Sequence, residues 1–209
     1  MENYRCVTSV QEIQEYIGNA AVVAFDYETA PDEPYRMEEK AALDPYKSHI
    51  VGCSFSTKEH TGIYVPVAHK VGENIENALF LCFLKSFLTN KNIIKIAHNI
   101  AFESAVSCHQ GIVIQPPVYD TICAAQMTLK SNYEFRKLAD SGLKKLASEL
   151  CHEPLPTFSE VTNGRHFDEL DAQDSETVRY GCADSDFALR LYHIFNNWFD
   201  RFLPKHRYI

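Results

Sequence analysis

The sequence has no apolar run close to the roughly 20 residues that a membrane-spanning helix requires. Its first residues, MENYRCVTSVQEI, lack the basic and then apolar order of a signal peptide. No internal repeat, low-complexity segment or long linker is visible. We therefore expect a single domain over residues 1–209, in the cytoplasm and without membrane association. With 45% apolar residues, the chain can form a substantial core.

CxxC pairs are also lacking. The seven cysteines are scattered, at positions 6, 53, 82, 108, 123, 151 and 182. An odd number of cysteines without paired spacing is typical of reduced, buried thiols in a cytosolic protein, and it argues against a zinc site.

An excess of positive charge is missing as well, since the formal net charge is −8. This charge argues against broad, non-specific binding of nucleic acid through a basic surface. It does not exclude an enzyme that holds nucleic acid at one site. An acidic cluster that binds metal is necessarily negative, and bound cations reverse its local sign.

The pattern of apolar residues and turn signals predicts a mixed sheet covered by helices, an α/β fold. We expect helices over 10–18 (with Ser9 as N-cap), 74–88, 98–108, 119–129, 142–150 and 172–198, the last interrupted near Gly181. We expect strands from Ala21, at 50–56 and 62–67 as a hairpin, at 92–97 and at Ile112–Val113. Segments 31–47 and 154–168 are expected to be an exposed loop and irregular chain.

The stretch Ala21–Ala30, AVVAFDYETA, organises the rest of the chain. Side chains alternate faces in a strand, so Asp26 and Glu28 point the same way. Two such carboxylates repel each other unless a cation lies between them, and oxygen ligands favour Mg²⁺ or Mn²⁺. The alternative is a strand end whose acids simply meet solvent.

Further acids occur far along the chain. Glu103 follows the strand predicted at 92–97, and Tyr180 and Asp184 are spaced to share one face of a helix. Four acids and a tyrosine suit two-metal phosphodiester hydrolysis, in which a pair of cations activates water and stabilises the leaving oxygen. Tyr180 would orient the attacking water.

The ordered motifs FDYET (25–29), YVPVAH (64–69), HNIAFE (98–103), YDT (119–121), GLKKLA (142–147) and YGCADSDFALRL (180–191) resemble a known family. They are similar to the tyrosine subgroup of DEDD 3′–5′ exonucleases, and more narrowly to the proofreading exonuclease domain of family-A, Pol I-like DNA polymerases. The resemblance implies an RNase H-like mixed β-sheet flanked by α-helices, two divalent cations (Mg²⁺ or Mn²⁺) and DNA 3′ ends as substrate. It implies Asp26, Glu28, Glu103 and Asp184 as metal ligands, with Tyr180 completing the catalytic set.

Two features depart from the family. Glu103 stands where the family usually has Asp, which leaves its part in holding the second ion open. No polymerase segment follows the last predicted helix. The chain is then expected to be an excised domain, a subunit that partners a separate polymerase chain, or a stand-alone exonuclease, from a bacterial cell or a phage.

Four further residues are substrate-binding candidates through the resemblance: Thr29, Asn99, Phe102 and Phe158. For three of them the residues also suggest a simpler, structural role. Thr29 can cap the strand end, Asn99 can cap the following helix, and Phe158 can be a core side chain. A stacking role for Phe158 against the terminal base is favoured slightly less than the core role.

Three neighbours of the motifs are expected to be structural: His98, Asp186 as a solvated or paired acid, and Asp120 as a helix cap. The densest basic stretch contains Lys130, Arg136, Lys137, Lys144 and Lys145. We expect this stretch either to form a solvated helix face or to guide a single strand of nucleic acid toward the acids.

The leading hypothesis is a metal-dependent 3′–5′ exonuclease that acts on single-stranded or frayed DNA. A 3′–5′ exoribonuclease of the ribonuclease D type shares the same acids and tyrosine. A degenerate domain that binds DNA ends, or that serves as a polymerase scaffold, is the non-enzymatic alternative.

Overall fold

A computed structural model describes residues 2–130 and 132–202. Over these residues the sheet has six strands in the order β1-β4-β3-β2-β5-β6. Their bounds are β1 Asn3–Cys6, β2 Val22–Pro31, β3 Ser48–Ser56, β4 Thr61–Pro66, β5 Ile94–Ala97 and β6 Val118–Asp120. Strands β2, β3 and β4 are antiparallel neighbours, whereas β1, β5 and β6 join in parallel. The predicted mixed sheet and its 50–67 hairpin are confirmed.

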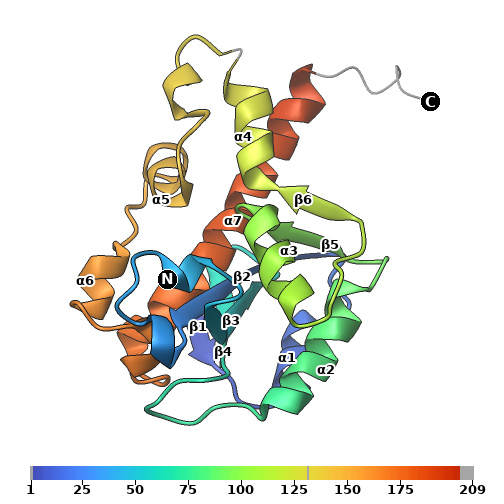
Figure 1. The fold of residues 1–209 in the computed structure, drawn as a ribbon. Helices are drawn as coiled ribbons and strands as arrows, with labels where there is room; N and C mark the ends of the chain where they lie inside the picture. Colours follow the sequence, from blue (N-terminus) through green and yellow to red (C-terminus); the bar gives the residue numbers. More distant parts are fainter. Residues whose placement is uncertain (1, 131, 203–209) are drawn as a thin grey trace.

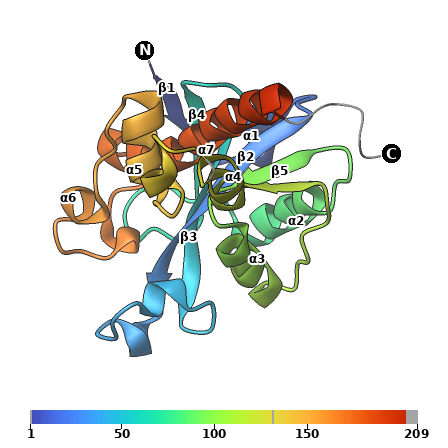
Figure 2. The same cartoon turned by 90° about the horizontal axis from the view of Figure 1, so that it is seen from above.

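Helices cover both faces of the sheet (Figures 1 and 2). Their bounds are α1 Val10–Ile17, α2 Asn77–Leu88, α3 Ile100–His109, α4 Thr121–Leu129, α5 Leu143–Leu146, α6 Phe158–Thr162 and α7 Ser175–Phe202. Phe25 of β2 and Phe55 of β3 pack with α1 and α2 on one side. On the other side α7 packs across β1 to β5. The expected α/β fold with helices on the sheet is therefore present.

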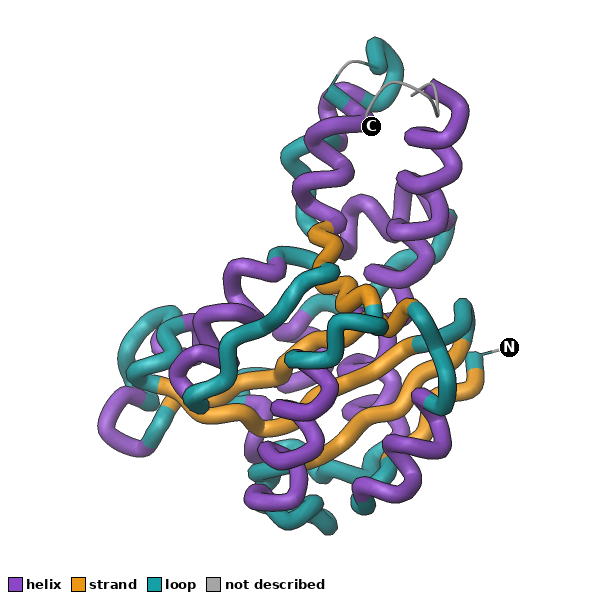
Figure 3. The backbone as a smooth tube through the Cα atoms, turned by 90° about the vertical axis from the view of Figure 1, so that its right-hand side faces the viewer, coloured by secondary structure: helices purple, strands orange, loops and turns teal. Residues whose placement is uncertain are grey.

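A second apolar cluster extends the molecule beyond the strands. Helices α4, α5 and α7 share a core that includes Leu129, Leu146, Phe187 and Phe195. Figure 3 shows this helical layer rising beyond the strands. It fixes α5 beside the middle of α7, which matters for the site.

Long α7 runs without interruption through Gly181, so the predicted break there is wrong. A Cβ at Gly181 would lie 2.6 Å from Tyr64 Cδ2. Tyr64 is fully buried, and its hydroxyl is hydrogen-bonded to His69 Nε2 at 2.7 Å. Gly181 thus allows the close approach of α7 to β4 rather than breaking the helix.

Other boundary predictions need correction. Ile112–Val113 is not a strand: Ile112 is buried in the core, Val113 is exposed, and the last strand is β6. Strand β1 was not predicted. Segment 154–168 contains the short helix α6. The helix expected over 142–150 is α5 followed by a π-helical turn over 147–151.

The 31–47 loop projects from the ends of β2 and β3 (Figure 2), as expected. Arg36 ties it to the buried Asp168, donating from Nη1 to Oδ1 at 3.1 Å. None of the described helices is long and apolar enough to cross a membrane.

Candidate active site

Three carboxylates from two elements meet at the face of the sheet that α7 covers. Asp26 and Glu28 come from β2, and Asp184 comes from α7. One oxygen from each lies within 4.8 Å of the others. The convergence follows from local geometry. Val23, Phe25 and Tyr27 alternate into the core on the α1–α2 side, so Asp26 and Glu28, at the intervening and following positions, face α7.

Bringing these acids together is electrostatically unfavourable in the absence of a cation. Burial, followed by the negative charge of Asp184, raises the pKa of Asp26 well above its ordinary value. Burial and then the charge of Asp26 raise the pKa of Glu28 in the same way. Burial raises the pKa of Asp184 to about 6. Glu28 Oε1 is buried and has no hydrogen-bond partner among the described residues. Such oxygen donors suit a hard divalent cation.

Glu103 lies in the first turn of α3 and is 1% exposed. It is outside the 4.8 Å group, yet after burial the charge of Asp26 is the next cause that raises its pKa. Its Oε2 is buried and, over the described part of the chain, has no hydrogen-bond partner. The fourth acid is thus on the Asp26 side of the site, separate from the tight group of three.

Tyr180 lies one turn before Asp184 on α7. Burial, and then the charges of Glu28 and Asp184, raise the pKa of its phenol, so the hydroxyl stays protonated. The Phe158 ring lies 6.3 Å from the Tyr180 ring and 6.3 Å from Phe167, centroid to centroid. Phe158 is 44% exposed, so the predicted core role for this residue is wrong. Its exposed ring lies beside that of the tyrosine.

The sequence indicates Lys144 only as a member of a basic stretch, whereas the structure places it at the site. Its Nζ donates to the Tyr180 hydroxyl at 3.1 Å and to the Pro156 carbonyl at 2.6 Å. Its neighbour Lys145 is exposed. Leu143 and Leu146 are the buried residues of α5, and their spacing decides which face of the helix each lysine lies on. This spacing of apolar residues is the one sequence signal that distinguishes Lys144 from Lys145.

Of the other substrate candidates, Thr29 lies on β2, and Asn99 and Phe102 lie at the start of α3. Thr29 Oγ1 donates to the Ala42 carbonyl at 2.6 Å and so anchors the 31–47 loop. Phe102 is half-buried against the main core. Asn99 is exposed, with a left-handed backbone at φ 81°, and its side chain makes no cap hydrogen bond. Asparagine is one of the few residues other than glycine that adopts this conformation readily.

Asp120 caps α3 instead of Asn99. Its carboxylate accepts from the backbone N–H of Asn99 and Ile100, both at 3.2 Å, and from that of Ile122 at 2.8 Å. The cap role expected for Asp120 is therefore present, and it serves two helices. His98 Nδ1 is hydrogen-bonded to Thr121 Oγ1 at 2.8 Å, in line with a structural role.

Asp186 is buried and paired, which was one of the two expected states. It ion-pairs with Arg190 and accepts from the Tyr4 hydroxyl at 2.6 Å. Among the cysteines, Cys82, Cys108 and Cys123 are exposed, so the prediction that the thiols are buried is only partly right. None of the seven cysteines forms a disulfide.

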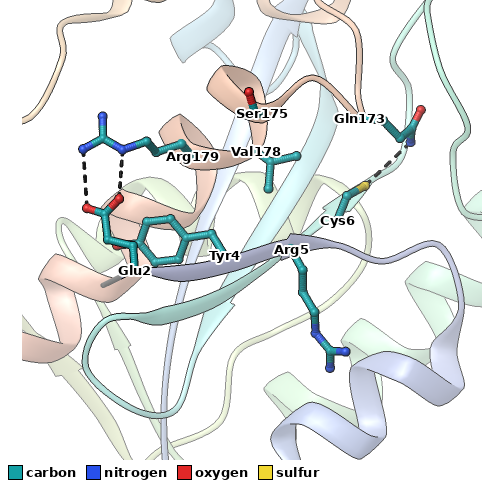
Figure 4. Close-up of a pocket in the computed structure, with 8 residues that line it drawn as sticks. All are labelled: Glu2, Tyr4, Arg5, Cys6, Gln173, Ser175, Val178 and Arg179. Atoms are coloured by element: carbon teal, nitrogen blue, oxygen red, sulfur yellow. Dashed lines mark hydrogen bonds and ion pairs between the residues drawn. The ribbon is translucent and has the colours of Figure 1, made fainter.

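A separate pocket of about 360 Å³ lies between β1 and the start of α7 (Figure 4). Glu2 and Arg179 close one side with an ion pair at 2.9 Å. None of the predicted site residues lines it. The acidic group is therefore distinct from this pocket.

The comparisons with known proteins agree with this fold and arrangement. The family model for the 3′–5′ exonuclease domain of family-A DNA polymerases matches residues 1–200. DNA polymerase I of Borreliella burgdorferi is 26% identical over 197 residues, which are 92% of this chain and 19% of that protein. DNA polymerase I of Pseudomonas aeruginosa is 25% identical over 179 residues, 83% of this chain and 18% of that protein. The chain thus spans about a fifth of the length of these curated relatives.

Solved structures of several nucleases share the fold. Brucella melitensis NrnC superposes with a TM-score of 0.63 at 19% identity, covering 96% of this chain and 83% of that one. Escherichia coli RNase D gives 0.64 at 14% identity, covering 95% of this chain and 46% of that one.

The class that the fold and the family model define is the DEDD-type 3′–5′ exonuclease domain with an RNase H-like sheet. Within that class, this chain belongs to the 3′–5′ exonuclease family of family-A DNA polymerases.

Proposed function

We propose that the domain hydrolyses the terminal phosphodiester bond at the 3′ end of single-stranded or frayed DNA with the help of two divalent cations. The observation that carries the proposal is the meeting of Asp26, Glu28 and Asp184 within 4.8 Å, next to the Tyr180 phenol. Three acids with raised pKa values and a buried oxygen without a partner are costly to maintain for structure alone.

The residues present fit such ions. Asp26, Glu28 and Asp184 would hold one, and Asp26 with Glu103 would hold the other. When bound, a pair of divalent cations lowers the pKa of the attacking water and stabilises the leaving oxygen. Mg²⁺ is bound in a structure of NrnC, and Mn²⁺ has similar ligand preferences.

The remaining chemistry belongs to this chain's own side chains. The protonated Tyr180 hydroxyl orients the attacking water. Phe158, exposed beside Tyr180, stacks on the terminal base, an interaction that contributes about 1–3 kcal/mol per base. Asn99, Phe102 and Thr29 complete the nucleotide pocket on the Glu103 and β2 sides. All of these roles are parts of the proposal.

DNA is favoured over RNA because the family and the curated relatives are those of DNA polymerases. The same relatives, which are bacterial DNA polymerases, support proofreading beside a polymerase chain in a bacterial cytoplasm as a further part of the proposal. The fold shared with RNase D favours an exoribonuclease as the second candidate. A degenerate scaffold is the third candidate, because Glu103 lies apart from the other acids.

The test is digestion of 5′-labelled DNA and RNA oligonucleotides with Mg²⁺ or Mn²⁺, with Asp26→Ala and Asp184→Ala proteins alongside. We expect a stepwise ladder from the 3′ end of DNA, abolished by either substitution. A ladder on RNA alone would favour the exoribonuclease. No ladder with any ion would contradict catalysis and favour the scaffold. Co-purification of the native chain with a polymerase tests the partner.

A further inference from the structure

Lys144 links three parts of the site that are far apart in the sequence. It is carried by α5, donates to Tyr180 on α7, and donates to the carbonyl of Pro156, which precedes α6. Helix α6 starts with Phe158, and its N-cap Thr157 forms a capping box with Glu160. One ammonium group therefore fastens the phenol to the segment that bears the exposed ring.

The direction of the Tyr180 hydrogen bond has a chemical consequence. Because the Lys144 ammonium can only donate, the Tyr180 oxygen accepts, and its own O–H is left free. After burial, the negative charges of Glu28 and Asp184 are the main causes that raise the pKa of this phenol. The Tyr180 O–H is thus available to donate to an attacking water held by the acids.

Lys144 also acts on the acids through its charge. It is the positive group that lowers the pKa of Asp26, Glu28 and Asp184 against the upward effect of burial. The same positive charge must repel a divalent cation that enters the group.

We propose that Lys144 is a positioning residue of the site: it orients the Tyr180 hydroxyl toward the attacking water, ties that hydroxyl to the Phe158 segment, and offsets the charge of the three acids in the metal-free protein. This inference rests on the proposed exonuclease activity for its kinetic part only.

The first test measures Mn²⁺ binding without any substrate. We compare wild-type protein, Lys144→Met and the matched control Lys145→Met, which removes the same charge from an exposed neighbour. Lys144→Met should bind Mn²⁺ roughly fivefold more tightly, since a nearby positive charge has gone. The control should change little. Equal affinities for all three proteins, or weaker binding by Lys144→Met, would overturn the charge role.

The second test is a double-mutant cycle with Tyr180→Phe, read as kcat on the oligonucleotide at saturating Mn²⁺. Lys144→Met should lower kcat about tenfold in the wild-type background, with little change in KM, and less than about twofold in Tyr180→Phe. Lys144→Arg, which keeps the charge and a donor, should recover part of the loss. An equal loss in both backgrounds would contradict action through Tyr180.

Thermal unfolding of each variant identifies a general loss of folding, which would lower Mn²⁺ affinity and kcat together. If the wild-type protein degrades neither DNA nor RNA, the proposed function fails. The Mn²⁺ comparison still decides the role of the Lys144 charge.

Discussion

At the scale of single residues, the acids were predictable and the lysine was not. Strand alternation places Asp26 and Glu28 on one face, and the i, i+4 spacing places Tyr180 above Asp184. Both relations are local, so the sequence carries them. The contact between Lys144 and Tyr180 depends on how α5 packs against α7, and no local pattern specifies it. The separation of Glu103 from the other three acids is likewise a tertiary result.

Asp26 is expected to be the most sensitive acid, because it belongs to the group with Glu28 and Asp184 and its charge also raises the pKa of Glu103. Asp26→Asn keeps the shape of the side chain and removes its charge. It should lower kcat at least about a thousandfold, through weaker ion binding, while the fold is retained. Single-turnover digestion with circular dichroism as the control measures this. A residual rate within about tenfold of wild type would exclude Asp26 as a shared ligand.

Glu103→Asp provides the corresponding test of the fourth acid. It restores the family's usual side chain, so we expect kcat to stay the same or rise. Glu103→Ala should lower it by a factor of roughly 100. Kinetics over a Mn²⁺ series measure both. If Glu103→Asp lowers kcat as much as Glu103→Ala does, the assigned ligand role is wrong.

At the scale of elements, strongly periodic segments were predicted well, whereas of the short strands only β5 was predicted. Helix α1 starts at Val10 with Ser9 as its N-cap, as the spacing indicates. Strand β6 has three residues and β1 has four, lengths at which pairing partners rather than composition decide the state. Gly181 was interpreted as a helix break because the sequence around it does not show why a glycine is needed there. The reason is the close approach of the buried Tyr64 ring, which comes from a distant strand.

Gly181→Ala tests this explanation through the sign of its effect. In an exposed helix the change would stabilise by about 1 kcal/mol. Here the added Cβ meets the Tyr64 ring, so we expect destabilisation by roughly 1–3 kcal/mol. Urea unfolding measures it. Gly142→Ala is the control, because no atom lies within 4 Å of the added Cβ there. Stabilisation by Gly181→Ala would refute the close-approach argument.

At the scale of the whole molecule, sequence reasoning recovered the α/β class and the family, since both depend on ordered motifs across the chain. It did not recover the second helical core of α4, α5 and α7, which carries Lys144 to the site. Sequence reasoning also missed the ion pair between Arg36 and the buried Asp168, which holds the 31–47 loop against a residue far away in the sequence.

The acidic group should make stability depend on pH and metal. The folded-state pKa of Asp184 is raised from 3.8 to about 6, so the folded protein holds a proton that the unfolded chain has released. Unfolding free energy should therefore fall as pH rises from about 4 to 6, by on the order of 2 kcal/mol.

Thermal scans in EDTA, compared with Asp184→Asn, isolate this contribution. The wild-type Tm should fall relative to the variant across that interval, and Mn²⁺ should restore it at pH 8 but not at pH 4. Parallel curves for the two proteins would contradict the prediction.

The most direct measurement is anomalous diffraction from crystals of the protein soaked in Mn²⁺. The account predicts one peak among Asp26, Glu28 and Asp184 and a second between Asp26 and Glu103, both lost in Asp26→Ala. Crystals that show no anomalous peak at these four acids would contradict it.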